Sequence, residues 1–344
     1  MTRLAIAALT PTGICLAKKI QASWETELPI FVPESKMETG LAVIPTGNFK
    51  QGLQQLFQQY DGLICIMATG IVVRSIADVV NDKRQDPAVI VLDEKGQHVI
   101  SLLSGHIGGG NQLAREIAEK IGGQAVITTA TDVQEVTALD LLAQEINGWY
   151  ADFKETTKKV NGLLANHQKV GLLQREKWVQ DLRGLTLLEE GDSLEPFETV
   201  LLVSDRDEPL TDAKIIQVVP RIYILGIGAR KGVTFEAIQE EYLNFCQQQG
   251  IHPQAMKKIV SIDLKKEEAG ICQLAAWLAV PFETYSAKEL APAAAKYPQS
   301  DFVKQTTGIG NVSLAAADLA SGGQVISERY AQHGVTFALG KDGK

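Results

Sequence analysis

The strongest constraint on this fold is the alternation of short apolar runs with amphipathic helical segments along the chain. Residues 4–9 and 62–67 are apolar runs of strand length, and residues 14–20 and 71–80 carry apolar side chains at helical spacing. Strands that alternate with helices form mostly parallel sheets, because each helix carries the chain back to the edge where the next strand begins. The sequence therefore predicts an α/β protein with mostly parallel, doubly wound sheets.

One segment predicts an antiparallel strand pair within this order. The apolar runs 88–92 and 98–103 flank Asp93-Glu94-Lys95-Gly96, which has the length and composition of a hairpin turn. We therefore expect Asp93 to bond the backbone of the turn. A helix should follow the second strand, because apolar side chains recur at every fourth position from Leu113 until Gly122.

The length of 344 residues exceeds that of a usual single domain. We predict an N-terminal α/β domain with glycine-rich loops over residues 1–148 and a C-terminal α/β domain over residues 219–344. Residues 149–218 are less regular and are interpreted as a smaller α/β connecting subdomain.

Composition excludes several classes of function. A net charge of -8 argues against binding of duplex nucleic acid, which needs a concentrated basic face. No apolar stretch reaches the roughly 18 to 20 residues of a membrane helix, so we expect a cytoplasmic protein. The four cysteines and five histidines lack the paired spacing of a zinc site, so no metal site built by the protein is expected.

Four loops are expected to bind a small molecule, because loops after strands meet helix N-termini whose free N–H groups favour anions. A single glycine-rich loop can equally serve only a tight turn or close helix packing, whereas four together favour binding. The positively charged side chains of Arg230 and Lys231 suit a carboxylate or a phosphate, and a solvated loop pair is the alternative. The loops are residues 68–70, 104–110, 226–232 and 307–311.

His106 is the sharpest candidate for chemistry, because it lies among Ser104, Gly105 and three further glycines before a predicted helix. A helix N-terminus lowers the pKa of a histidine and favours the neutral base. The alternative is a loop histidine that bonds the backbone. Asp132 and Asp263 lie at strand ends, where they are either functional carboxylates or helix caps.

Motifs of other enzyme classes are missing or incomplete. The run 226–232 approaches the dinucleotide fingerprint, but its third glycine is displaced by one position and no acidic residue follows at about 20 positions. Neither the Walker phosphate loop nor the nucleophile elbow of α/β hydrolases occurs. A nucleotide-dependent oxidoreductase is thereby disfavoured.

Eight ordered motifs together carry a family resemblance. They are MATGIVVR at 67–74, DPAVIVLDEKG at 86–96, ISLLSGHIGG at 100–109, ATD at 130–132, GIG at 226–228, SIDLKKEE at 261–268, PF at 281–282 and TGIGNV at 307–312. With these motifs the chain resembles the cobalt-precorrin-5A hydrolase family of anaerobic cobalamin biosynthesis across nearly its whole length, and least over residues 149–218. Many relatives have cysteine where this chain has Ala229 and Ser313, which disfavours a cysteine-dependent mechanism.

The resemblance implies a hydrolase that opens the δ-lactone of cobalt-precorrin-5A and releases acetaldehyde to give cobalt-precorrin-5B. Cobalt would arrive within the substrate, and no further cofactor is expected. His106 would act as the base with Asp132 or Asp263 assisting, and the amides of residues 108–110 would bind the lactone oxyanion. The residues expected to bind the anionic tetrapyrrole are Thr69, Gly70, Arg74, Ser104, Gly105, Gly108, Gly109, Gly110, Gly228, Arg230, Lys231, Lys265, Gly308, Gly310 and Asn311.

Two expectations concern partners. Transient contact with the neighbouring methyltransferases of the pathway is expected, whereas nucleic acid and membranes are not. The alternative function is a non-catalytic corrinoid carrier or assembly partner in the same pathway, which would bind the substrate without releasing acetaldehyde.

Overall fold

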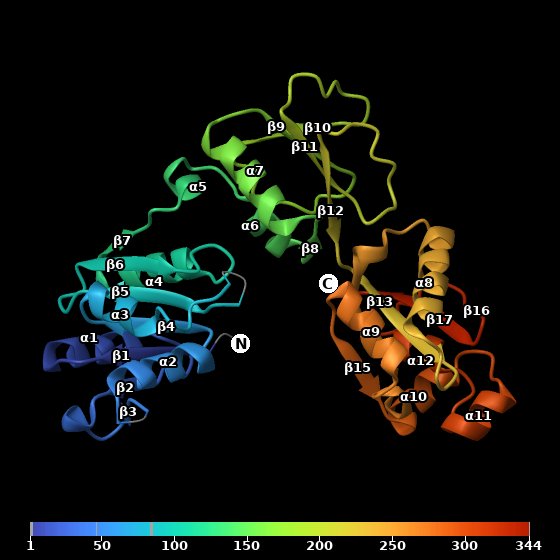
Figure 1. The fold of residues 1–344 in the computed structure, drawn as a ribbon, viewed down its shortest axis with the longest axis horizontal. Helices are drawn as coiled ribbons and strands as arrows, with labels where there is room; N and C mark the ends of the chain where they lie inside the picture. Colours follow the sequence, from blue (N-terminus) through green and yellow to red (C-terminus); the bar gives the residue numbers. More distant parts are fainter. Residues whose placement is uncertain (1–2, 46, 83–84, 344) are drawn as a thin grey trace. The chain divides into compact units, whose positions relative to one another are not determined.

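The computed structural model describes residues 3–45, 47–82 and 85–343, which form two compact units, residues 1–141 and 142–344. The α/β class with mostly parallel sheets is confirmed (Figure 1). No helix in these described ranges combines the length and the apolar character needed to cross a bilayer.

The first unit is built on a seven-stranded sheet in the order β3-β2-β1-β4-β5-β6-β7. All neighbouring strands are parallel except β5 and β6, which form the predicted antiparallel pair. Its strands are β1 (Leu4–Ala8), β2 (Ile30–Val32), β3 (Ala42–Val43), β4 (Gly62–Ile66), β5 (Ala88–Leu92), β6 (His98–Leu103) and β7 (Gln124–Val126).

Helices cover both faces of this sheet, as the doubly wound prediction requires. Alternate residues of β1 point to opposite faces, so Ile6 packs with α1 and α4, whereas Ala5 packs with α2 and α3. The helices are α1 (Pro11–Ala22), α2 (Phe49–Gln59), α3 (Thr69–Ile76), α4 (Gly110–Ile121) and α5 (Ala130–Val133); α6 (Leu139–Glu145) begins at the end of the unit, and η1 (Glu34–Lys36) is a short 3-10 turn.

The antiparallel pairing of β6 decides where the loops of the first unit lie. Leu103 at the end of β6 pairs with Val89 near the start of β5, so the loop 104–110 leaves the sheet at the edge where β1, β4 and β5 begin. β7 runs parallel to β6, so the segment after β7 leaves at the same edge. The loop 68–70 follows β4 and therefore lies at the opposite edge.

The second unit contains two five-stranded sheets. The first has the order β10-β9-β11-β12-β8 and is parallel except for the short pair of β12 and β8. Its elements are β8 (Gly148–Trp149), β9 (Val170–Gln174), β10 (Leu185–Leu188), β11 (Thr199–Val203), β12 (Ile215–Pro220) and the helix α7 (Phe153–Ala165).

The other sheet of this unit has the order β15-β14-β13-β17-β16, in which β13, β14 and β15 are parallel. An antiparallel hairpin, β16 and β17, completes it beside β13, and the sequence patterns do not predict this hairpin. The strands are β13 (Tyr223–Ala229), β14 (Met256–Ile262), β15 (Phe282–Tyr285), β16 (Tyr330–Gln332) and β17 (Val335–Lys341).

Helices again pack on both faces of this sheet. α8 and α9 share one apolar cluster with Leu225 and Phe337, whereas α10 and α12 share another with Ile224 and Val260. The helical elements are α8 (Phe235–Gln249), α9 (Ala269–Leu278), α10 (Ala287–Ala294), α11 (Asp301–Thr307) and α12 (Val312–Ala320), with 3-10 turns at η2 (Pro253–Ala255) and η3 (Asp263–Lys265).

Candidate active site

The glycine-rich loop of the first unit is fixed by bonds within itself and to the start of β5. Ser104 has a positive φ of 55° and donates its hydroxyl to the carbonyl oxygen of Asp86 at 2.9 Å. The backbone N–H of Gly110 donates to the Ser104 carbonyl at 3.0 Å. Gly105 has no room for a side chain, because a Cβ there would lie 2.5 Å from Oδ1 of Asn111. These glycines therefore permit a tight loop that presents His106.

The imidazole of His106 lies between two carboxylates. Nε2 is 3.2 Å from Oδ2 of Asp132 and 3.1 Å from Oγ1 of Thr131, and Nδ1 is 3.5 Å from Oδ2 of Asp140. The His106 side chain is 12% exposed and that of Asp140 only 2%. The structure thus brings the predicted pair of His106 and Asp132 together and adds a second carboxylate from the first turn of α6.

The expectation that the pKa of His106 is lowered is wrong. Burial does lower it, but the hydrogen bonds and charges of Asp140 and then Asp132 outweigh burial, and the pKa lies above its ordinary value. The carboxylates stabilise the imidazolium, because opposite charges at this distance favour the charged form. The arrangement therefore suits a proton donor better than a resting neutral base.

Asp132 contacts several polar side chains of this cluster. It accepts hydrogen bonds from Nδ2 of Asn111 at 2.7 Å and from the guanidinium of Arg115 at 2.6 Å. Burial acts to raise the pKa of Asp132, but Arg115 and then His106 outweigh it, and the pKa is lowered. Asp132 is consequently an ionised acceptor rather than an acid.

The predicted oxyanion donors need correction. The backbone N–H of Gly109 donates to the His106 carbonyl at 2.8 Å, and that of Gly110 is used within the loop. Two of the three amides are therefore already engaged, and the donor role stays a prediction for Gly108. Gly108 and Gly109 border a pocket of about 860 Å³ at this edge of the sheet.

The structure does not bring Thr69, Gly70 and Arg74 to His106. They belong to α3 at the opposite edge of the sheet, and Arg74 lies in the last turn of this helix. The guanidinium folds back over Gly70, where a Cβ would lie 3.2 Å from Nη1 of Arg74. Asp93 at the same edge accepts from the N–H of Lys95 at 2.9 Å and of His98 at 2.7 Å, so its predicted turn role is confirmed.

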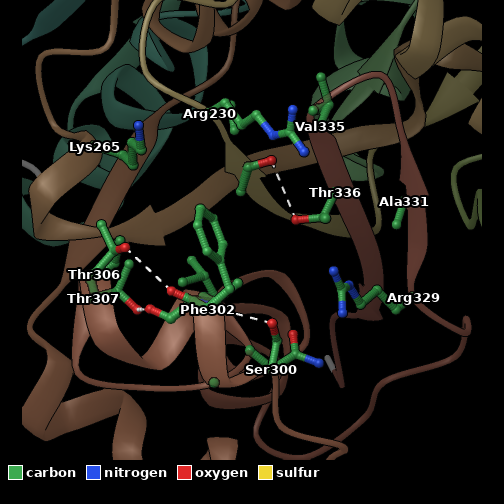
Figure 2. A pocket seen from close by; sticks show the side chains of 18 of the residues that line it. Arg230, Lys265, Ser300, Phe302, Thr306, Thr307, Arg329, Ala331, Val335 and Thr336 are labelled. Atoms are coloured by element: carbon green, nitrogen blue, oxygen red, sulfur yellow. Dashed lines mark hydrogen bonds between the residues drawn. The ribbon is translucent and has the colours of Figure 1, made fainter.

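The second unit carries a pocket of about 690 Å³ at the carboxyl ends of β13 and β14 (Figure 2). Its base includes Asn311, whose Oδ1 caps α12 by accepting from the N–H of Leu314 at 3.2 Å. Lys265 is paired with Glu268 at 2.8 Å. Six predicted substrate-binding residues line this pocket, namely Gly228, Arg230, Lys231, Lys265, Gly310 and Asn311.

Two other predicted site residues of this unit, Gly308 and Asp263, do not line the pocket. Gly308, with φ of 81°, ends α11. Asp263 is an exposed residue of η3, in the other unit from His106. Of the positions where relatives often have cysteine, Ala229 lines the pocket whereas Ser313 is fully buried.

Among the residues of these sites that sequence reasoning missed are Asp140, Phe302 and Arg329. The sequence marks Asp140 only as an acidic residue in the first turn of a helix. A carboxylate at this position usually stabilises the helix by interacting with its dipole. Phe302 and Arg329 line the pocket from α11 and from the segment before β16. Within the described ranges, no three His, Cys, Asp or Glu side chains are grouped to hold a metal ion.

Comparisons with known proteins define the class first. Residues 51–132 match the family described as Cobalamin synthesis G N-terminal, residues 137–220 match the Cobalamin biosynthesis central region, and residues 223–340 match the Cobalamin synthesis G C-terminus. A crystal structure of a cobalamin biosynthesis protein G homologue from Sulfolobus solfataricus covers 99% of this chain and 97% of its own, with 18% identity and a TM-score of 0.41.

Curated relatives narrow the class. The chain is 42% identical to the cobalt-precorrin-5A hydrolase of Salmonella typhimurium, over 98% of this chain and 97% of that protein. It is 30% identical to the cobalt-precorrin-5A hydrolase of Priestia megaterium, over 94% of this chain and 90% of that protein. The chain therefore belongs to the cobalt-precorrin-5A hydrolase family.

Proposed function

We propose that this protein hydrolyses cobalt-precorrin-5A, opening its δ-lactone and releasing acetaldehyde to yield cobalt-precorrin-5B. The observation that carries this proposal is the 42% identity to the Salmonella typhimurium hydrolase over nearly the whole of both chains. Cobalt enters as part of the substrate, and the protein supplies no cofactor of its own. The reaction takes place in the cytoplasm, with transient contact to the methyltransferases of neighbouring steps.

Each half of the reaction requires two proton transfers of opposite direction. Water adds to the lactone carbonyl and loses a proton, and the lactone oxygen takes up a proton as its bond to the carbonyl carbon breaks, which leaves a carboxyl group and a free hydroxyl on the two-carbon bridge. That hydroxyl then loses its proton as the carbon–carbon bond breaks, acetaldehyde departs, and the macrocycle carbon takes up a proton. One side chain that acts first as a base and then as an acid can therefore catalyse both lactone opening and acetaldehyde release.

His106 is the group proposed for these transfers. In each half its imidazole first accepts a proton, from water and then from the bridge hydroxyl, and the resulting imidazolium, held by Asp132 and Asp140, returns it, to the leaving lactone oxygen and then to the macrocycle carbon. Asp132 stays ionised because Arg115 and His106 lower its pKa. The amide of Gly108 stabilises the lactone oxyanion.

Binding of the polycarboxylate is assigned to the cation-lined pocket of the second unit. Arg230 and Lys231 are exposed at its rim, and Lys265 lies deeper with 15% of its side chain exposed. A local cluster of positive charge can hold carboxylates although the whole chain carries a net charge of -8.

The test is anaerobic incubation of the full chain with cobalt-precorrin-5A and trapping of acetaldehyde. His106→Ala should lower acetaldehyde release by about 10²- to 10⁴-fold, the usual contribution of acid and base catalysis. His98→Ala is the matched control, because His98 is 56% exposed and pairs with Asp93 in the hairpin turn. Undiminished release by His106→Ala would eliminate the assigned role, and binding without any acetaldehyde from the wild type would favour a carrier.

A further inference from the structure

The pocket of the second unit is lined by more positive charges than ion pairs with described carboxylates account for. Arg230, Lys231 and Arg329 each line it, and none of them forms an ion pair with a residue in the described part of the chain. Lys265 forms an ion pair with Glu268 at 2.8 Å, and the charge of Lys231 also acts on this carboxylate from a greater distance. Unpaired cations that converge on one hollow favour an anionic ligand with more than one acidic group.

An aromatic side chain enters the same space. Phe302 is 73% exposed, although it lies in a helix, and Figure 2 shows its ring directed between Lys265 on one side and Arg329 on the other. The pocket volume of about 690 Å³ is typical of small-molecule sites. An exposed ring inside a pocket offers a flat apolar face to a ligand rather than packing for the core.

The helix that carries Phe302 is firmly placed. Ser300 caps α11 and accepts from the N–H of Val303, and the N–H of Ser300 donates to the Gly310 carbonyl at 2.9 Å. Thr307 at the other end donates its hydroxyl to the carbonyl of Ile309 at 2.8 Å. Phe302 and Thr306 both line the pocket, as residues four apart on one helix face should.

The opposite wall is the β16 and β17 hairpin, which carries Arg329 at its entrance. Its tip is fastened on both sides: the N–H of Arg230 donates to the Gly334 carbonyl at 2.8 Å, and His333 contacts Glu241 of α8 at 2.5 Å. The hydroxyl of Tyr330 also donates to Glu241. The aromatic ring and the guanidinium therefore line the same pocket from two anchored walls.

We propose that Phe302 and Arg329 are the specificity-determining residues of this pocket. Phe302 stacks on the face of a flat macrocycle, and Arg329 binds a carboxylate at the macrocycle edge. This inference rests on the proposed function, since it places part of the tetrapyrrole in the pocket. It predicts that the pocket prefers a flat polycarboxylate to a polycarboxylate of similar charge without a ring.

The probes are cobalt uroporphyrin, a flat macrocycle with carboxylate arms, and citrate, a polycarboxylate with no ring. With the full chain, Phe302→Ala should weaken cobalt uroporphyrin binding by about 5- to 150-fold, the equivalent of losing one stacking contact, and should leave citrate binding unchanged. Phe302→Tyr should retain macrocycle affinity, whereas Phe302→Leu, which is apolar without a ring, should lose it.

Arg329→Gln should weaken both probes about fivefold at low salt and less at high salt, because the contact is ionic and exposed. Lys304→Gln on α11 and Ile326→Ala, both exposed and outside the pocket, are the matched controls and should bind both probes like the wild type. Melting temperatures of all variants should agree, because the side chains of Phe302 and Arg329 are exposed.

Acetaldehyde release by the wild type separates the two proposals. If the wild type releases acetaldehyde but Phe302→Ala and Arg329→Gln keep the wild-type KM and probe affinities, the inference is overturned and the proposed function stands. If the wild type releases none, the proposed function fails. The probe affinities then decide the inference: a loss in Phe302→Ala confined to the macrocycle supports it, and equal affinities overturn it.

Discussion

Gly226 of β13 permits the close approach of α12 that places Asn311 at the base of the pocket, so replacing it should damage both stability and binding. A Cβ at this position would lie 2.0 Å from the carbonyl oxygen of Ser313 and 2.9 Å from the backbone N of Ala317. Real Cβ contacts below 3.0 Å are essentially never seen, so Gly226→Ala must separate α12 from β13 by about 1 Å.

The cost follows from this geometry. The obstructing atom is backbone and cannot rotate away, so we expect a loss near the upper end of overpacking, about 3 kcal/mol. At about 2–4 °C per kcal/mol for a domain of this size, the melting temperature of the second unit should fall by about 6–12 °C. Macrocycle binding should weaken as well, because the cap of α12 moves with the helix.

Differential scanning calorimetry of the full chain measures this effect, with Gly162→Ala as the control in the same unit. Gly162 lies inside α7 with no atom within 4 Å of an added Cβ, so this change should stabilise by about 0.5–1 kcal/mol. A melting temperature for Gly226→Ala within about 2 °C of the wild type would refute the packing argument.

Two further predictions concern titration and thiol reactivity. Asp140→Asn removes a carboxylate that raises the pKa of His106. In the pH profile of acetaldehyde release, the limb that depends on the imidazolium should therefore move to lower pH, with KM unchanged. A profile identical to that of the wild type would contradict the positioning role of Asp140. Because the folded-state pKa of His106 is raised, its ion pairs stabilise the protein fully below the unfolded pKa of about 6.5, and this contribution is lost as pH rises through the folded value. Cys65 and Cys246 are buried, and burial raises the pKa of each thiol to about 12, whereas Cys15 and Cys272 are exposed. Ellman's reagent at pH 8 should therefore titrate two thiols in the native protein and four in guanidinium, and rapid native reaction of three would disprove the burial pattern.

Strand and helix patterns predicted several residues that line the second pocket, but not that this unit carries a pocket of its own. Parallel strands end at one edge, so Gly228 after β13 and Lys265 after β14 had to meet there, and Asn311 joined them as the cap of α12. The hairpin that forms the other wall was missed, because residues 330–341 carry no glycine-rich turn after a strongly apolar run.

The first unit shows where sequence reasoning stopped short. The hairpin turn at Asp93 was predicted, but its consequence was not drawn: reversal of β6 sends the loop of His106 to the edge away from Arg74. Asp140 was missed for another reason. Its contact with His106 joins residues 34 positions apart (140 − 106), and neither residue's local sequence indicates the other.

The contacts that hold the β16 and β17 hairpin against α8 affect the thermodynamics of ligand binding in the pocket. Glu241 is itself 5% exposed and holds Tyr330 and His333, so this wall is already ordered when the pocket is empty. A preformed wall has little conformational entropy to lose on binding. Ligand binding here should therefore carry only a small entropic penalty from this wall.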